Sequence, residues 1–173
     1  MGPELAKTLR RADQMSGINR DVIVASTFGN HTTYKSLEKD GVRCIPGDLT
    51  DPSFINSLPR AGQVIYMLGY KFGSGTDWHR TFYINSIVPY LIGERFRDAN
   101  IVVFSSTNPY ASVRYMPTGP FNSEHGISNF RSTLTGGSRE DSALQPQGVY
   151  GWSIVAREAS FANTAARHSQ QRI

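Results

Sequence analysis

Short apolar runs alternate along this chain with stretches in which apolar residues recur at helical spacing. Four runs predict β-strands, because continuous apolar segments of this length are typical of strands covered on both faces. They span residues 21–27, 42–45, 63–68 and 101–104. Since the strands alternate with helices, the pattern predicts an α/β fold with a parallel sheet.

Five further segments have the spacing or the end signals of helices. They span residues 3–14, 34–39, 51–58, 78–97 and 151–168. Pro89 lies inside the fourth segment and predicts a kink there, because proline lacks the N–H that a helix interior needs. In the last helix, the residues expected to face inward are Ile154, Val155, Ala159, Ala162 and Ala166.

A long irregular stretch separates the fourth strand from the last helix. It comprises the 42 residues before Tyr150 and is rich in Gly, Ser, Asn and Pro. Loops of that length inside a compact domain are usually functional or mobile. The sequence has no internal repeat or domain boundary, and its length is that of one domain.

Composition narrows the class of protein. Of the 173 residues, 39% are hydrophobic and 18% are charged, as in ordinary soluble domains. No apolar run reaches the roughly 18 residues of a transmembrane helix, so we expect a cytoplasmic protein without membrane contacts. The single cysteine, Cys44, excludes an internal disulfide and fits a reducing compartment. The net charge of +4 is scattered, which argues against a nucleic-acid partner.

Small and polar residues follow the end of every predicted strand. These strand ends are Ser26 with Thr27, Gly47 with Asp48, Gly69 with Tyr70 and Lys71, and Ser105 with Ser106 and Thr107. In open α/β sheets ligands bind beyond the carboxyl ends of the strands, so one polar ligand could contact four segments. No spacing indicates a metal site. The histidines expected on the surface are His31, His79, His125 and His168.

The segment from Tyr150 to Ile154, downstream of Ser105, Ser106 and Thr107, resembles the active-site segment of a known family. This is the NAD-dependent epimerase/dehydratase family of extended short-chain dehydrogenase/reductases. The resemblance covers nearly the whole chain in the right order. It implies a Rossmann-type, doubly wound parallel sheet, with NAD or NADP and a small polar substrate such as a sugar nucleotide as ligands.

The resemblance also implies roles for single residues. Tyr150 would be the proton donor or acceptor, and Ser106 or Thr107 would hold the substrate hydroxyl. Spacing from the strand favours Thr107, whereas spacing to Tyr110 favours Ser106. The cofactor contacts implied are Gly2, Thr27, Asp48, Leu49, Gly69, Tyr70, Lys71, Asn85 and Ser105.

Two of these contacts have a structural alternative that the sequence leaves open. The carboxylate of Asp48 could instead cap the turn that begins at Pro46. Asn85 could be a residue of the helix interior that binds neighbouring backbone. Cofactor choice also stays open, because neither an acidic residue for NAD nor an Arg for NADP follows Ser26 and Thr27.

The chain departs from the family pattern at Ile154, where the family has a Lys beside the catalytic Tyr. An unperturbed Tyr has a pKa near 10, so only about one in a thousand is ionised at pH 7. Proton transfer through Tyr150 is therefore expected to be slow or absent. Lys71, just beyond the third strand, is a hypothetical replacement cation. Arg157 is a poorer substitute because it lies about 4.5 Å further along the helix axis.

A second departure concerns the start of the chain. The family begins with a strand and a glycine-rich loop, whereas only Met1 and Gly2 precede the first helix here. Gly2 resembles the last glycine of that loop, so the first strand and most of the phosphate cradle are expected to be missing. That strand would lie between strands 21–27 and 63–68. Their edges would then be unpaired or forced together.

Residues 1–173 are therefore expected to be one partial NAD(P)-binding domain, truncated from a longer protein. Two functional interpretations stay open. One is an epimerase/dehydratase-like enzyme, and the other is a non-catalytic nucleotide-sensing module or an inactive fragment. The resemblance further implies a homodimer formed through helices 78–97 and 151–168.

Overall fold

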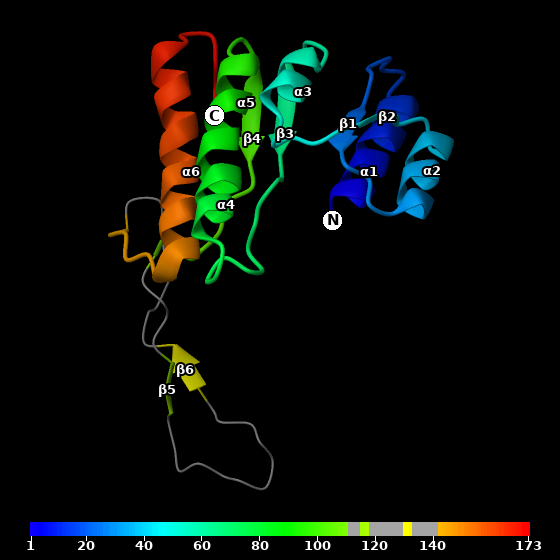
Figure 1. Cartoon of the computed structure of the whole chain (residues 1–173). Coiled ribbons are helices and arrows are strands. Elements are labelled where there is room, and N and C mark those ends of the chain that lie inside the picture. The colour runs from blue at the N-terminus through cyan, green and yellow to red at the C-terminus, as the bar shows by residue number, and fades with distance from the viewer. Residues whose placement is uncertain (111–114, 118–129, 133–141) are drawn as a thin grey trace, which may run out of the picture.

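Helices and strands alternate along the chain (Figure 1). The structure, a computed structural model, describes residues 1–110, 115–117, 130–132 and 142–173. The elements are α1 (Gly2–Met15), β1 (Ile23–Ser26), α2 (His31–Lys39), β2 (Arg43–Pro46), α3 (Pro52–Ser57), β3 (Gln63–Tyr66), α4 (Trp78–Phe82), the π-helix η1 (Tyr83–Ile87), α5 (Val88–Arg95), β4 (Asn100–Val103), β5 (Tyr115–Pro117), β6 (Phe130–Ser132) and α6 (Gly148–Arg167).

The first four strands form two parallel pairs. β1 pairs with β2, with Val24 opposite Cys44, and β3 pairs with β4, with Ile65 opposite Val102. Each pair with the helix or helices between its strands is a βαβ unit. The prediction of parallel strands alternating with helices is confirmed. Among the described strands, β1 and β3 are not paired with each other, so their facing edges are unpaired rather than joined.

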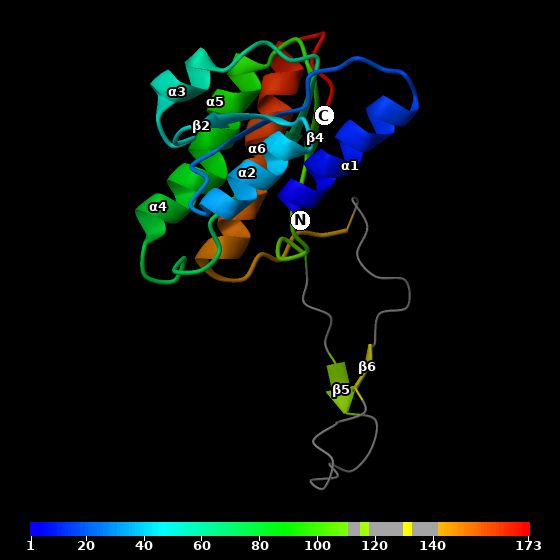
Figure 2. The same cartoon turned by 90° about the vertical axis from the view of Figure 1, so that its right-hand side faces the viewer.

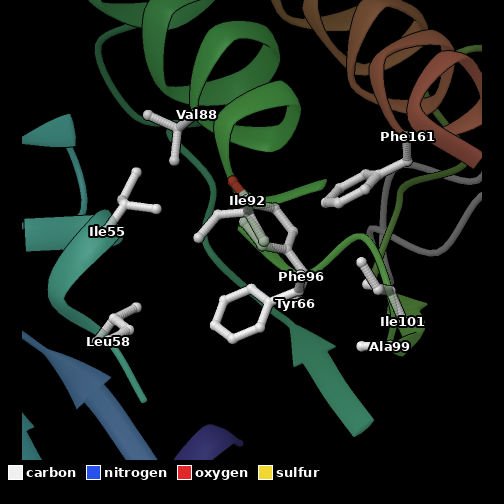
Figure 3. Packing of buried hydrophobic residues seen from close by; sticks show 9 residues of the cluster. All are labelled: Ile55, Leu58, Tyr66, Val88, Ile92, Phe96, Ala99, Ile101 and Phe161. Carbon is white, nitrogen blue, oxygen red and sulfur yellow. The ribbon is translucent and has the colours of Figure 1, made fainter. Parts of the chain in front are cut away.

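Two hydrophobic cores cover the opposite faces of the β1–β2 pair. Val24 and Cys44 pack against the smaller core, which α1 and α2 share with that pair. Their chain neighbours Ala25 and Ile45 pack against the larger core, as the alternation of side chains along a strand requires. The larger core, shown in Figure 3, consists of Ile55, Leu58, Tyr66, Val88, Ile92, Phe96, Ala99, Ile101 and Phe161.

Polar contacts attach α1 to its surroundings. Asp13 is buried in α1 and pairs with Arg20, whose hydrogen bonds hold the pKa of this carboxyl below its usual value. Lys7 binds Ser36 Oγ at 2.7 Å and Asp40 at 3.3 Å, and so ties α1 to α2 and the residue that follows it. These contacts fix the direction of α1 and hence the place of its first residue, Gly2.

The helix predicted for residues 78–97 is interrupted in the turn that precedes Pro89. The irregular turn is the π-helix η1, which lies before Pro89, and Pro89 itself belongs to the first turn of α5. The distortion expected from Pro89 takes the form of a widened turn over Tyr83–Ile87. A proline ring clashes with the carbonyl four residues earlier, here that of Asn85. The wider π turn relieves that clash.

The inward face of α6 also differs from the prediction. Ile154 is fully buried as expected and Val155 is half-buried, but Ala159, Ala162 and Ala166 are exposed. The buried residues instead include Arg157, Phe161 and Thr164. Burying an aromatic ring removes more apolar area from water than burying alanines, so the helix turns Phe161 toward the larger core.

The long stretch before α6 contains a strand pair that the sequence did not indicate. β5 and β6 pair antiparallel and lie apart from the other elements (Figure 1 and Figure 2). A bridge between Tyr110 and Leu144 closes the base of this stretch. At the other end of α6, the chain returns to β4, where Arg172 forms a parallel bridge with Asn100.

Two surface predictions can be compared with the structure. Within the described parts of the chain, no helix is long and apolar enough to cross a membrane.

The histidines were all predicted to lie on the surface. His31 and His79 are exposed, whereas His125 lies outside the described residues. The prediction for His168 was wrong, because its ring is half-buried and lies 3.2 Å from both carboxylate oxygens of Glu94. Nothing in the spacing of the sequence identified this partner.

Candidate functional site

A cavity of about 490 Å³ lies between α1, the β1–β2 pair and β3. Its size falls within the range of about 300–1,000 Å³ found for small-molecule sites. Most of its lining is apolar, from residues such as Val24, Ile65 and Leu68. The predicted cofactor contacts that it brings together are Gly2, Thr27, Asp48 and Leu49.

Asp48 caps a turn at the rim of this cavity. Its Oδ1 accepts a hydrogen bond of 2.8 Å from the backbone N–H of Thr50. That bond is the main cause that holds the pKa of Asp48 below its usual value, and the charge of Arg80 acts in the same direction. The capping alternative is therefore present in the structure. Contact between Asp48 and an adenine ring stays a prediction.

A second group of predicted residues is organised by Asn85, which is fully buried in η1. The Asn85 side chain binds both backbone polar groups of Tyr70. Tyr70 N–H donates to Asn85 Oδ1 at 2.8 Å, and Asn85 Nδ2 donates to the Tyr70 carbonyl at 2.9 Å. Asn85 thus fixes the segment that follows β3. The expectation that this residue binds nearby backbone is confirmed, whereas a role toward the cofactor stays a prediction.

Arg157 has a more central place in the site than the sequence indicated. Its side chain is buried in α6, where Nη2 donates to Asn85 Oδ1 at 2.8 Å and Nη1 donates to the Phe104 carbonyl at 3.1 Å. Burial lowers the pKa of Arg157 from its usual value. A Cβ at Gly69 would lie 2.8 Å from Nη2, so the guanidinium lies directly against the strand end. A single cation therefore ties the ends of β3 and β4 to α6.

The same network extends to Tyr150 in the first turn of α6. Asn85 Nδ2 donates to Ser153 Oγ at 2.9 Å, and Ser153 Oγ donates to the Tyr150 carbonyl at 2.8 Å. The ring of Tyr150 is half-buried and faces Lys71, whose Nζ lies 5.8 Å from the ring centroid. Ile154, one turn further on, is fully buried.

The hydroxyl groups that end β4 differ in their partners. Ser105 Oγ donates to Glu158, and Ser106 Oγ donates to Asn108 Oδ1 at 2.8 Å. In the described part of the chain the hydroxyl of Thr107 forms no hydrogen bond, and the residue is exposed. Thr107 is therefore the hydroxyl most available to a ligand. Its role, and that of Ser106, stays a prediction.

The predicted site residues thus fall into two groups that meet at the end of β3. Leu68 lines the cavity, and the next residue, Gly69, begins the group around Asn85 and Arg157. The cavity can accept a flat, largely apolar group. In the second group Asn85 and Arg157 are bound to the scaffold, and the groups left to meet a ligand include the Thr107 hydroxyl, the Tyr150 phenol and the Lys71 ammonium. Among residues whose placement is described, no cluster of His, Cys, Asp or Glu could hold a metal ion.

Solved structures with this fold are known, although the comparisons by sequence found no match. No protein-family model matches it, and no curated protein matches its sequence. A UDP-Glc/GlcNAc 4-epimerase from Campylobacter jejuni has a TM-score of 0.69 at 14% identity, over 95% of this chain and 46% of the epimerase chain. A UDP-glucuronic acid 4-epimerase from Bacillus cereus, solved with NAD and a fluorinated UDP-sugar, has a TM-score of 0.69 at 14% identity, over 97% and 50%.

A third example is the enzyme WbmG from Bordetella bronchiseptica in complex with NAD and UDP. Its TM-score is 0.62 at 17% identity, over 91% of this chain and 46% of that chain. At such identities the likeness concerns the fold, which is therefore of the Rossmann type found in these enzymes. The chain spans about half the length of these proteins.

Proposed function

We propose that the whole protein binds NAD or NADP across the carboxyl ends of β1 to β4 and acts on a sugar nucleotide or a similar polar substrate. The observation that carries this proposal is the cavity that gathers Gly2, Thr27, Asp48 and Leu49. It lies in a fold whose solved examples hold NAD and UDP-sugars. Residues 1–173 would form the single nucleotide-binding domain of this protein.

The residues present fit the adenosine half of a dinucleotide. Leu49 and the apolar strand residues would contact the adenine faces, and Asp48 would accept a hydrogen bond from its amino group. Gly2 is the first residue of α1 and lies on the cavity. The N–H groups at the start of a helix attract phosphate, and since Pro3 has none, the contact of α1 with the pyrophosphate would be made by Gly2.

The nicotinamide half would lie toward the Asn85 group, against Gly69, Tyr70 and Lys71. When bound, it would accept a hydride from the substrate and return one. Tyr150 would exchange a proton with a substrate hydroxyl that Thr107 or Ser106 orients. Ser105, whose hydroxyl binds Glu158, would support the strand end beside the cofactor.

Nucleotide binding is tested by titration calorimetry of the folded chain with NAD, NADH, NADP and NADPH. We expect micromolar affinity for at least one of them, and about tenfold weaker binding by Asp48→Asn because a charged acceptor is lost. The matched control is Asp51→Asn. Asp51 Oδ1 accepts from Ser53 N–H at 2.8 Å, as Asp48 does from Thr50, but Asp51 does not line the cavity.

Equal weakening by Asp48→Asn and Asp51→Asn would mean that Asp48 acts only as a turn cap. A folded chain that binds none of the four nucleotides would overturn the proposal for residues 1–173.

A homodimer is proposed from an apolar surface on α4 and η1. Trp78, Phe82 and Ile87 are exposed there, Trp78 to 60%, and exposed apolar groups of this kind often mark interfaces. We expect the unmodified chain to sediment as a dimer and Trp78→Glu to sediment as a monomer. The control is Met15→Glu, since Met15 is an exposed apolar residue at the end of α1. Identical sedimentation of both variants and the unmodified chain would contradict this interface.

The second candidate function is a non-catalytic nucleotide-sensing module. The residue at position 154 favours this sensing module, because Ile154 is fully buried and uncharged and cannot supply a cation beside Tyr150. For the same reason Ile154→Lys would bury an ammonium and destabilise the fold. Hydride transfer should therefore be tested on the unmodified protein. Nucleotide binding without any transfer would support the sensing module.

A further inference from the structure

Lys71 faces the ring of Tyr150 from the loop after β3, whereas Ile154 lies on the same helix as Tyr150. The distance from its Nζ to the ring centroid is 5.8 Å, inside the range of about 6 Å in which an ammonium interacts with an aromatic face. The two residues are 79 positions apart in the sequence and belong to the loop after β3 and to α6. Their meeting is therefore a product of the fold.

The backbone that carries Lys71 is held in place. The preceding residue, Tyr70, has its N–H and its carbonyl bound to the side-chain amide of Asn85 at 2.8 and 2.9 Å. A two-point contact of this kind fixes both the position and the orientation of a peptide segment. The side chain of Lys71 is exposed, and among the described residues it forms no hydrogen bond or ion pair.

Tyr150 is held by the same side chain. Asn85 Nδ2 donates to Ser153 Oγ at 2.9 Å, and that hydroxyl donates to the Tyr150 carbonyl at 2.8 Å. Asn85 itself is fully buried and therefore rigidly packed. One amide group thus sets the position of the loop that bears Lys71 relative to the helical turn that bears Tyr150.

The other cation near Tyr150 is already committed to the scaffold. The charge of Arg157 interacts with Tyr150, but its two terminal nitrogens are hydrogen-bonded to Asn85 and to the Phe104 carbonyl. Glu158 interacts with Arg157 and accepts the hydroxyl of Ser105. Of these two cations, Lys71 is therefore the one that can interact with the phenol and with a ligand.

We infer that Lys71 is the positioning residue of Tyr150 and supplies from the β3 loop the positive charge that the helix lacks at Ile154. The inference rests on the proposed function, in which Tyr150 exchanges a proton with the substrate. A positive charge beside a phenol stabilises the negative charge that develops on its oxygen as the proton leaves. Lys71 therefore acts through Tyr150, and it keeps this role before any nucleotide binds.

The test follows nitration of Tyr150 by tetranitromethane, which reacts with phenolates, in the protein without nucleotide. The rate is measured by mass spectrometry of the peptide that contains Tyr150. We expect Lys71→Met to slow it about fivefold, in proportion to the modest strength of such contacts, and Lys71→Arg to restore it. Lys35→Met is the control, because Lys35 is exposed on α2. Tyr90, on α5, is the internal reference for folding.

An unchanged rate in Lys71→Met would overturn the inference. Equal slowing in Lys71→Met and Lys71→Arg would also overturn it, because the effect would then come from side-chain packing rather than charge. Calorimetry with NADH separates this result from the proposed function. Should the unmodified chain bind no nucleotide, the proposed function fails, while the nitration rates still decide the role of Lys71.

Discussion

Replacement of Asn85 by Ala is expected to lower the free energy of unfolding by about 3–5 kcal/mol, because buried polar groups would lose their partners. Tyr70 would lose the acceptor of its N–H and the donor to its carbonyl. Among the described residues, Arg157 would keep only the Phe104 carbonyl as a hydrogen-bond partner of its buried guanidinium. A buried charge left with too few hydrogen bonds is among the costliest defects in a protein interior.

Arg157→Met is the variant to compare with Asn85→Ala. It removes the buried charge together with its need for partners, so we expect a smaller loss of about 1–2 kcal/mol. Tyr70 keeps both hydrogen bonds to Asn85 in that variant. In the Arg157→Met background, Asn85→Ala should therefore cost less than it does alone. Urea unfolding of the single and double variants gives the coupling energy, which we expect to be about 1–3 kcal/mol.

The control for this series is Asn163→Ala, since Asn163 is exposed on α6. Its effect should lie within about 0.5 kcal/mol, as for other surface substitutions. Strictly additive losses for Asn85→Ala and Arg157→Met would contradict the structure, because they would mean that the two side chains do not share a network.

Gly93→Ala is expected to lower the free energy of unfolding by about 2–3 kcal/mol through overpacking between α5 and α6. A Cβ at Gly93 would lie 2.4 Å from Thr164 Oγ1 and 2.9 Å from Thr164 Cβ. Thr164 is fully buried and cannot turn its branched side chain into solvent. The helices would have to separate, and α6 carries Tyr150 and Arg157.

A compensating change distinguishes this cause from a general weakness of the helix. Thr164→Gly in the Gly93→Ala background should recover part of the lost thermal stability, because it removes the side chain that the new methyl group meets. The control is Gly62→Ala, since a Cβ at Gly62 would meet nothing within 4 Å. A Gly93→Ala variant as stable as the Gly62→Ala variant would show that the two helices pack less closely than the structure indicates.

The hydrophobic pattern predicted most of the fold, because each strand is a short apolar run and each run is bounded by turn residues. The run around Val24 and the run around Ile65 were both expected as strands, and both pair in parallel. The π-helix was not predictable in the same way. A proline at position 89 indicates strain in a helix, but which turn absorbs that strain depends on packing.

Some residues of the candidate site were predicted from the sequence and others were not, again because packing decides the surroundings of a side chain. Asn85 was identified through the family resemblance, and the structure supplies the physical basis of its place, a buried amide that binds backbone. The role of Arg157 was missed, because an arginine between Ile154 and Phe161 on a helix is usually solvated at its charged end. Its burial depends on the Phe104 carbonyl and Asn85, which are distant in sequence.

The unpaired edges of β1 and β3 have a mechanical consequence. Backbone hydrogen bonds across a sheet resist shear, but no such ladder joins the two βαβ units in the described parts of the chain. Their cohesion depends on side chains such as Ala25 and Ile45, which pack against the larger core. Apolar contacts are not directional, so the shapes of these packed side chains, and no backbone ladder, set how one unit lies against the other. The cavity between the units is therefore bounded by side-chain packing rather than by a continuous sheet.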